Sequence, residues 1–193
     1  MGQFIFPTEF VFWTKNPTHK TNKAQLLQKI AASLEYTKEK QTEHWLCDVN
    51  TGFFSYEDDV QKYMRLCTDS IYPALDQMFA EIPHIKTPRS SKITKIWYNH
   101  YGPNGVSGQE VHTHVGHGNS YSGIYLLSLL EPNTTVFYSH LASCSMPGAI
   151  NAAFQTRFAQ EGDILLFPSA LMHYVLPAKT PRTTIAFNVE CTY

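Results

Sequence analysis

The chain lacks several patterns that define common protein classes. No stretch approaches the eighteen consecutive apolar residues of a membrane-spanning helix, so we expect no membrane span. No basic run exceeds two residues and the net charge is −1, which argues against a dedicated nucleic-acid surface. The N-terminal sequence MGQFIFPTEFVFW has neither the basic segment nor the small-residue cleavage site of a secretory signal.

Closely spaced cysteines are also missing. The four cysteines are scattered along the chain without a C-x-x-C pair: Cys47, Cys67, Cys144 and Cys191. A zinc ribbon or a thioredoxin-type site is therefore not indicated. Because no secretion signal is recognisable, we expect free thiols and a cytoplasmic location.

The length of 193 residues fits a single domain, 1–193, and we find no internal repeat or low-complexity linker. Apolar residues recur at helical spacing over Thr21–Tyr36, and again over about Tyr56–Glu81. Pro73 is expected to kink or divide the second helix, and Thr87–Ser91 is expected to be a loop. The helical part thus spans about residues 1–91.

From about residue 92 to 193 the pattern changes to short β-branched and aromatic segments, most of them bounded by Gly, Pro, Asn or Asp. These segments are KITKIWYNHY, SYSGIYLLSLL, TTVFYSHL, GDILLFPS, MHYVLPA and RTTIAFNVE. Helices followed by six to eight strands predict an α+β protein with a sandwich or jelly-roll core, against which the N-terminal helices pack. The strand pattern alone fits a non-catalytic binding module equally well.

Histidines gather in the sequence EVHTH. In an extended strand, Glu110, His112 and His114 share one face, so H-x-H directs two imidazoles toward one point, where a metal can bind. His173, at the start of a late strand, is the best candidate for a third ligand. His117 lies among glycines, and the other histidines show no grouping. A lone H-x-H is a weak signal, and solvated or core histidines are the alternative.

Arg182 lies on an otherwise apolar strand. A buried arginine is costly unless it meets an anion, and its planar guanidinium suits a carboxylate. Thr184, two residues on, points the same way and can donate its hydroxyl to the same carboxylate. Metal ligands beside a carboxylate clamp indicate a site for a metal-chelating oxo acid. The alternative is a strand-end arginine that extends to solvent.

Four elements in this order, YGPNG…EVHTH, SGIYLL, GDILLFPSALMHYVLP and PRTTIAFNV, resemble a known family. It is the iron(II)- and 2-oxoglutarate-dependent oxygenases, on the prolyl-hydroxylase-like branch of the double-stranded β-helix (jelly-roll) fold, and small bacterial and phage members are especially similar. The resemblance covers about Ile96–Val189. It implies an enzyme that uses Fe(II), 2-oxoglutarate and O2 to hydroxylate a substrate, with release of succinate and carbon dioxide.

The resemblance also implies residue roles. His112 is the first ligand of the H-x-[D/E] motif and His173 the distal histidine. Arg182 binds the far carboxylate of 2-oxoglutarate with support from Thr184, and Tyr101 occupies the position of a tyrosine beside the cosubstrate. A core aromatic is the alternative for Tyr101.

One position departs from the family pattern, because His114 stands where a carboxylate is usual. Three alternatives follow: His114 is itself a ligand, Glu110 supplies the carboxylate, or the site has two histidines and an open position. We favour a metal held by His112, His114 and His173.

Two rival classes remain, a cupin-like metal-binding jelly-roll enzyme and a non-catalytic binding module. The substrate is not identified by the sequence; a protein prolyl residue, a small molecule and a nucleobase all fit. Tyr98, Tyr121 and Tyr138 either stack on such a group or belong to the core. The long segment Ser139–Gln155 is a candidate substrate loop.

Overall fold

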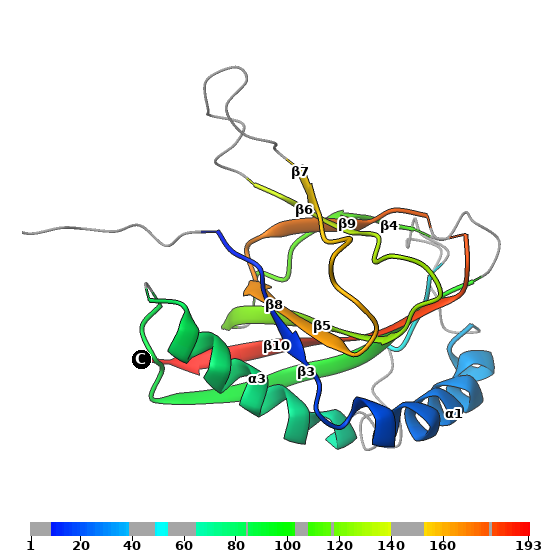
Figure 1. The fold of residues 1–193 in the computed structure, drawn as a ribbon, viewed down its shortest axis with the longest axis horizontal. Coiled ribbons are helices and arrows are strands. Elements are labelled where there is room, and N and C mark those ends of the chain that lie inside the picture. Colours follow the sequence, from blue (N-terminus) through cyan, green and yellow to red (C-terminus); the bar gives the residue numbers. More distant parts are fainter. Residues whose placement is uncertain are drawn as a thin grey trace, which may run out of the picture.

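Two antiparallel β-sheets face one another in the computed structural model, and two helices cover the outer side of the larger sheet (Figure 1). The structure describes residues 9–38, 49–53, 65–83, 85–102, 108–116, 118–139, 153–177 and 179–193. All of the paired strands in this part of the chain run antiparallel.

The larger sheet has six strands in the order β1-β8-β5-β10-β3-β2. Their bounds are β1 (Phe12–Lys15), β8 (Asp163–Pro168), β5 (Asn119–Ser128), β10 (Arg182–Thr192), β3 (Ser90–Tyr101) and β2 (Asn50–Thr51). The four central strands confirm predicted segments, although β3 begins inside the expected loop Thr87–Ser91. The edge strands β1 and β2 lie in the part of the chain that was expected to be helical.

The smaller sheet has four strands in the order β4-β9-β6-β7. They are β4 (Gln109–His112), β9 (Met172–Val175), β6 (Thr135–Tyr138) and β7 (Ala153–Gln155). The strand β7 occupies the end of the candidate substrate loop, and residues 140–152 of that loop lie outside the described residues. Its prediction as a long loop is therefore wrong at Ala153–Gln155, where the chain pairs with β6.

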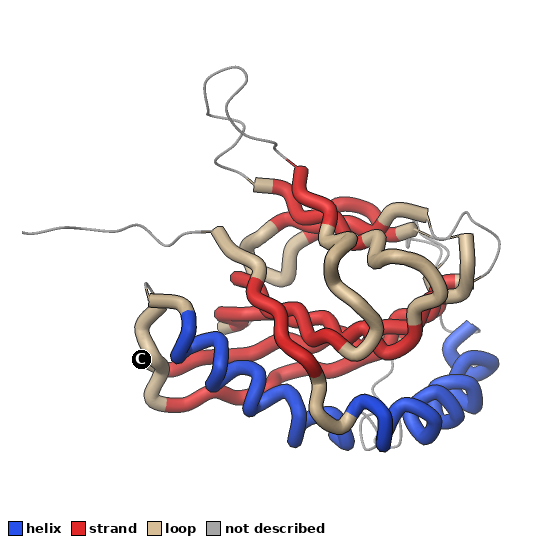
Figure 2. The backbone as a smooth tube through the Cα atoms, viewed as in Figure 1, coloured by secondary structure: helices blue, strands red, loops and turns tan. Residues whose placement is uncertain are grey.

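Helix α1 (His19–Lys38) confirms the first predicted helix, and α3 (Thr68–Glu81), preceded by the short 3-10 turn η1 (Arg65–Cys67), confirms the second in part. Helix α3 is not divided at Pro73, which lies in its second turn, where the missing proline N–H costs one backbone hydrogen bond. Both helices lie along the outer face of the larger sheet (Figure 2). No helix among the described residues is long and apolar enough to span a membrane.

Side chains alternate between the two faces of the central strands, so each face of the larger sheet belongs to a different apolar cluster. Side chains such as Tyr98, Tyr125 and Phe187 point outward and pack with Ile71 and Leu75 of α3. The opposite faces of the same strands contribute Ile124, Leu126, Leu165 and Phe167 to a second cluster that meets Phe137 of the smaller sheet. The space between the sheets is thus filled at the β5 and β8 side, and the inner faces of β3 and β10 are left for the candidate site.

Candidate active site

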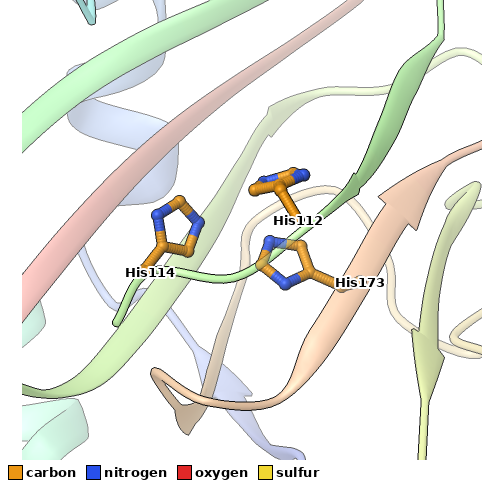
Figure 3. A group of neighbouring side chains, drawn as sticks. All are labelled: His112, His114 and His173. Carbon is orange, nitrogen blue, oxygen red and sulfur yellow. The ribbon is translucent and has the colours of Figure 1, made fainter. Parts of the chain in front are cut away.

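Three histidines converge between the two sheets, and Figure 3 shows their rings turned toward one another. One nitrogen from each of His112, His114 and His173 lies within 4.8 Å of the others. The ring centroids are 4.2 Å apart for His112 and His173, and 5.1 Å apart for each of the other two pairs. The three imidazoles can therefore bind a single metal ion.

The local geometry of β4 decides which of its side chains face this centre. Gln109 pairs with Val175 and His112 pairs with His173, so three steps along β4 match two steps along β9. The extra residue is a β-bulge, which changes the alternation of side chains. Gln109 and His112 consequently both line the inner cavity, whereas strict alternation had put Glu110 on the face of His112.

Glu110 is exposed and does not belong to the histidine cluster. The strand also ends at His112, so His114 lies two residues beyond it rather than on it. His114 still joins the cluster, because its backbone N–H donates to the Ser169 carbonyl oxygen at 2.9 Å. The predicted meeting of His112, His114 and His173 is therefore present, but a bulge and a loop produce it instead of a regular strand.

Hydrogen bonds select the metal-binding nitrogen of two histidines. The Nδ1 atom of His112 lies 2.7 Å from the Glu110 carbonyl oxygen, and that of His173 lies 3.1 Å from the Leu171 carbonyl oxygen. A carbonyl oxygen only accepts, so Nδ1 of each ring must carry the proton. The Nε2 lone pair of each ring is then free to bind a metal, an arrangement typical of metal-ligating histidines.

Burial keeps the three rings neutral at pH 7. It lowers the pKa of His114 to about 3, with a further contribution from neighbouring His112. Burial likewise lowers the pKa of His112, and it holds that of His173 well below the ordinary value. Metal ligation requires the neutral imidazole, so these side chains need not lose a proton before a metal binds.

Arg182 is buried in the same cavity, with 3% of its surface exposed. Its two terminal nitrogens donate to the Thr134 and Thr135 hydroxyls at 2.9 and 2.7 Å, and its Nε has no hydrogen-bond partner among the described residues. Its only ring contact in the described residues is Tyr101, whose centroid lies 5.2 Å from the guanidinium carbon. No carboxylate of the described residues forms an ion pair with it. The exposed strand-end alternative is therefore wrong.

One cavity joins Arg182 to the histidines. Its lining includes both polar and apolar residues: Trp97, Asn99, Tyr101, Gln109, His112, His114, Ile124, His173, Val175, Arg182, Thr184 and Ala186. All six site residues expected from the sequence thus share this cavity. Tyr101 donates its hydroxyl to the Gln109 Oε1 atom at 3.1 Å, which fixes its ring beside Arg182.

Sequence reasoning missed several residues of this cavity. Asn99 is directly opposite Thr184 in the β3–β10 pairing, is 6% exposed, and its amide makes no hydrogen bond with a described residue. Trp97, two residues earlier, contacts the His114 ring at 5.5 Å. Polar and aromatic residues at every second position of β3 could have identified Trp97 and Asn99 from the sequence. No local pattern identifies Thr134 and Thr135, because they meet Arg182 from a distant part of the chain.

The remaining candidates lie elsewhere. His117, His44, His84 and His140 are outside the described residues. His19 bonds to the Tyr125 hydroxyl and His100 to the Thr183 hydroxyl, as structural histidines would. Tyr98 and Tyr121 belong to the core beneath the helices, so they cannot stack on a substrate.

Sequence comparisons find no counterpart, since no family model and no curated protein matches the chain. Solved structures do match. A prolyl hydroxylase from Trichoplax adhaerens, solved with a hypoxia inducible factor peptide, has a TM-score of 0.61 at 14% identity, covering 94% of this chain and 83% of that one. A Pseudomonas putida prolyl-4-hydroxylase has a TM-score of 0.53 at 12% identity, covering 96% and 95%.

A third similar structure is SnoN, a non-heme alpha ketoglutarate dependent epimerase from nogalamycin biosynthesis. Its TM-score is 0.65 at 12% identity, covering 95% of this chain and 78% of that one. These likenesses establish the fold: the chain has the double-stranded β-helix shared by prolyl hydroxylases and an alpha-ketoglutarate-dependent enzyme. The predicted α+β jelly-roll class with packed helices is confirmed.

Proposed function

We propose that residues 1–193 form a single iron(II)- and 2-oxoglutarate-dependent oxygenase domain that hydroxylates its substrate. One observation carries the proposal: a three-histidine cluster and a buried arginine that forms no ion pair with a described carboxylate line the same cavity. A metal-binding jelly roll of the cupin kind has no need of Arg182. A non-catalytic module has no need of either feature. The fold likeness to prolyl hydroxylases supports the same conclusion.

The histidines suit iron(II). Imidazole is a ligand of borderline softness that binds divalent iron, and three imidazoles on one side leave other coordination positions open. His112, His114 and His173 would hold the metal. The first two come from one segment of the chain, His112 from the end of β4 and His114 from the loop that follows. The carbonyl oxygens of Glu110 and Leu171 fix the tautomers of His112 and His173.

The arginine suits the far carboxylate of 2-oxoglutarate. The unpartnered Nε of Arg182 is a buried donor that a carboxylate oxygen would satisfy. Thr184 lines the same cavity, and its hydroxyl can donate to the second oxygen. Thr134 and Thr135 hold the other guanidinium nitrogens, which orients the fork before the ligand arrives.

When bound, iron(II) with 2-oxoglutarate and O2 supplies the oxidising chemistry of hydroxylation, with succinate and carbon dioxide as the co-products. The chain's own part is to bind and orient. His112, His114 and His173 would hold the metal, and Arg182 would bind the far carboxylate of the oxo acid and so orient it. Ile124, Val175 and Ala186 contribute apolar surface to the wall, which would limit access of water there.

We propose a peptide or a small molecule as the substrate, because the similar structures include a prolyl hydroxylase bound to a peptide and an epimerase of nogalamycin biosynthesis. A prolyl side chain is the first substrate to test, and a nucleobase the last. We also propose a cytoplasmic location, where the free thiols of Cys67 and Cys191 would stay reduced.

The test is anaerobic titration with iron(II) and then with 2-oxoglutarate. An oxygenase develops the weak visible charge-transfer band of the metal chelate, and admission of O2 then releases succinate. A cupin-like protein binds the metal without the band, and a binding module gives neither signal. His173→Ala should abolish tight metal binding, because one of three ligands is gone. Unchanged iron stoichiometry in folded His173→Ala would overturn the assignment.

A further inference from the structure

His114 is held differently from the other two histidines. His112 and His173 lie opposite each other on β4 and β9, so pairing within the smaller sheet fixes both. His114 follows the end of β4 and has no strand partner. Something other than sheet pairing must therefore hold the third ring against the metal position.

Two hydrogen bonds hold the backbone of His114, one on each side of its Cα. Its N–H donates to the Ser169 carbonyl oxygen at 2.9 Å, and its carbonyl oxygen accepts from the Asn119 side-chain amide at 3.1 Å. Fixing both peptide groups restricts the two backbone dihedrals, and so the direction of the Cα–Cβ bond. Both partners are attached to the larger sheet: Asn119 begins β5 and Ser169 follows β8.

The Asn119 amide is itself oriented. Its Oδ1 atom accepts from the Thr94 hydroxyl of β3 at 2.9 Å, so its nitrogen must point the other way, toward His114. Its backbone N–H donates to the Gly116 carbonyl oxygen at 3.0 Å, which closes the intervening turn. Positive φ angles at Gly116 and Gly118 allow that turn. The chain Thr94–Asn119–His114 thus connects β3 to the metal cluster.

We propose that Asn119 is a positioning residue for the third metal ligand, which it anchors to the larger sheet while the other two ligands belong to the smaller sheet. This inference rests on the proposed metal site. Its consequence is that the geometry of the centre depends on how the two sheets are held relative to one another. Asn119 is too far along the chain, five residues from His114, to be recognised from the H-x-H motif.

Asn119→Asp is the sharpest variant. Aspartate has nearly the same shape and still accepts from Thr94, but it cannot donate to the His114 carbonyl and sets an anion against it. Loss of an outer hydrogen bond of this kind weakens metal binding by about 10-fold or more. Asn22→Asp on α1 is the matched control, because its amide also donates one side-chain hydrogen bond, to Thr18, far from the cluster.

The probe is Cu(II), which binds nitrogen sites tightly enough to be measured even with two ligands. Affinity comes from competition with a chromophoric chelator, and nitrogen hyperfine structure in the electron paramagnetic resonance spectrum reports the number of imidazoles. We expect three nitrogens for the wild type and for Asn22→Asp. We expect two for His114→Ala, and a loss of the third in Asn119→Asp.

The decisive comparison is the double variant His114→Ala/Asn119→Asp. If Asn119 acts through His114, the second substitution changes Cu(II) affinity no further once His114 is absent. An equal loss in both backgrounds means a merely structural role and overturns the inference. Thr94→Val, which frees the Asn119 amide without adding charge, should give a smaller loss of about threefold, in line with a partly lost hydrogen bond. Thr94→Val therefore tests the role of Asn119 even if Asn119→Asp fails to fold.

Failure of the underlying proposal gives a separate result. If His112→Ala, His114→Ala and His173→Ala all bind Cu(II) like the wild type, the metal site itself is wrong. If those variants lose affinity while Asn119→Asp and Thr94→Val do not, the metal site stands and the role of Asn119 is refuted.

Discussion

Arg182 should lower the stability of the ligand-free protein. Its guanidinium is almost wholly buried, has an Nε without a partner, and forms no ion pair with any described carboxylate. Transfer of such an ion from water costs several kcal/mol, which two threonine hydroxyls offset in part. Burial lowers the pKa of Arg182, which expresses the same penalty. A side chain of similar length without charge would avoid it.

We therefore expect Arg182→Met to be more stable than the wild type in the absence of ligand. Replacing buried ionic groups by apolar ones of similar volume stabilises proteins by about 1–4 kcal/mol. For a domain of this size the melting temperature should rise by roughly 2–4 °C for each kcal/mol. The measurement is thermal unfolding in a buffer without phosphate or carboxylate, so that no small anion neutralises the arginine.

Ligand should shift the comparison in favour of the wild type. At a concentration of 100 Kd, 2-oxoglutarate stabilises a protein that binds it by about 2.7 kcal/mol. The metal-loaded wild type should gain this, whereas Arg182→Met should gain little. Arg157→Met, at an exposed arginine, is the control and should change stability by less than about 0.5 kcal/mol. A ligand-free Arg182→Met that melts below the wild type, or that gains equally from 2-oxoglutarate, would refute the reasoning.

Three further outcomes follow from the geometry. His114→Asp should retain iron and part of any succinate release, because a carboxylate restores the usual donor set. His114→Ala should bind iron more weakly. Equal iron affinity of the two variants, measured by competition with a chelator, would contradict this. Glu110→Gln should leave iron affinity unchanged, since the exposed carboxylate is outside the cluster; a clear loss would restore Glu110 as a ligand. Gly123→Ala should destabilise the protein by about 3 kcal/mol, because a Cβ there would overlap the buried ring of Phe187; urea unfolding checks this, and a change within error would show that the core rearranges freely.

Much of the fold was predictable because the central strands carry their own pattern. β-branched and aromatic runs between turn residues marked β3, β5, β8 and β10, and helical spacing marked α1. The strand β1 was not predictable in this way. Its partner β8 lies about 150 residues later in the chain, and a strand of four residues contains no local pattern that predicts so distant a pairing.

The candidate site was likewise predictable only where its residues are close in the sequence. The grouping of His112 with His114, and of Arg182 with Thr184, follows from short spacings that the sequence displays. The exclusion of Glu110 does not, since it depends on a bulge between Gln109 and His112 that only the register with β9 reveals. The hydroxyl partners of Arg182 are Thr135, the first residue of β6, and Thr134 just before it. No local sequence pattern marks these two threonines, because they meet Arg182 only when the two sheets are assembled.

The charges in the cavity link the unusual ligand set to the buried arginine. None of the described residues that line it carries a carboxylate, so a divalent metal on three neutral imidazoles would keep its full charge, and the charge of Arg182 lies in the same cavity. A doubly negative oxo acid offsets most of this total, binding the metal with one end and the arginine with the other. Metal and oxo acid should therefore each strengthen the binding of the other, by equal factors. In a site with the usual carboxylate, part of the neutralising charge belongs to the protein; in the proposed three-histidine site the oxo acid would bring it, so the metal should bind more tightly when the oxo acid is present than when it is absent.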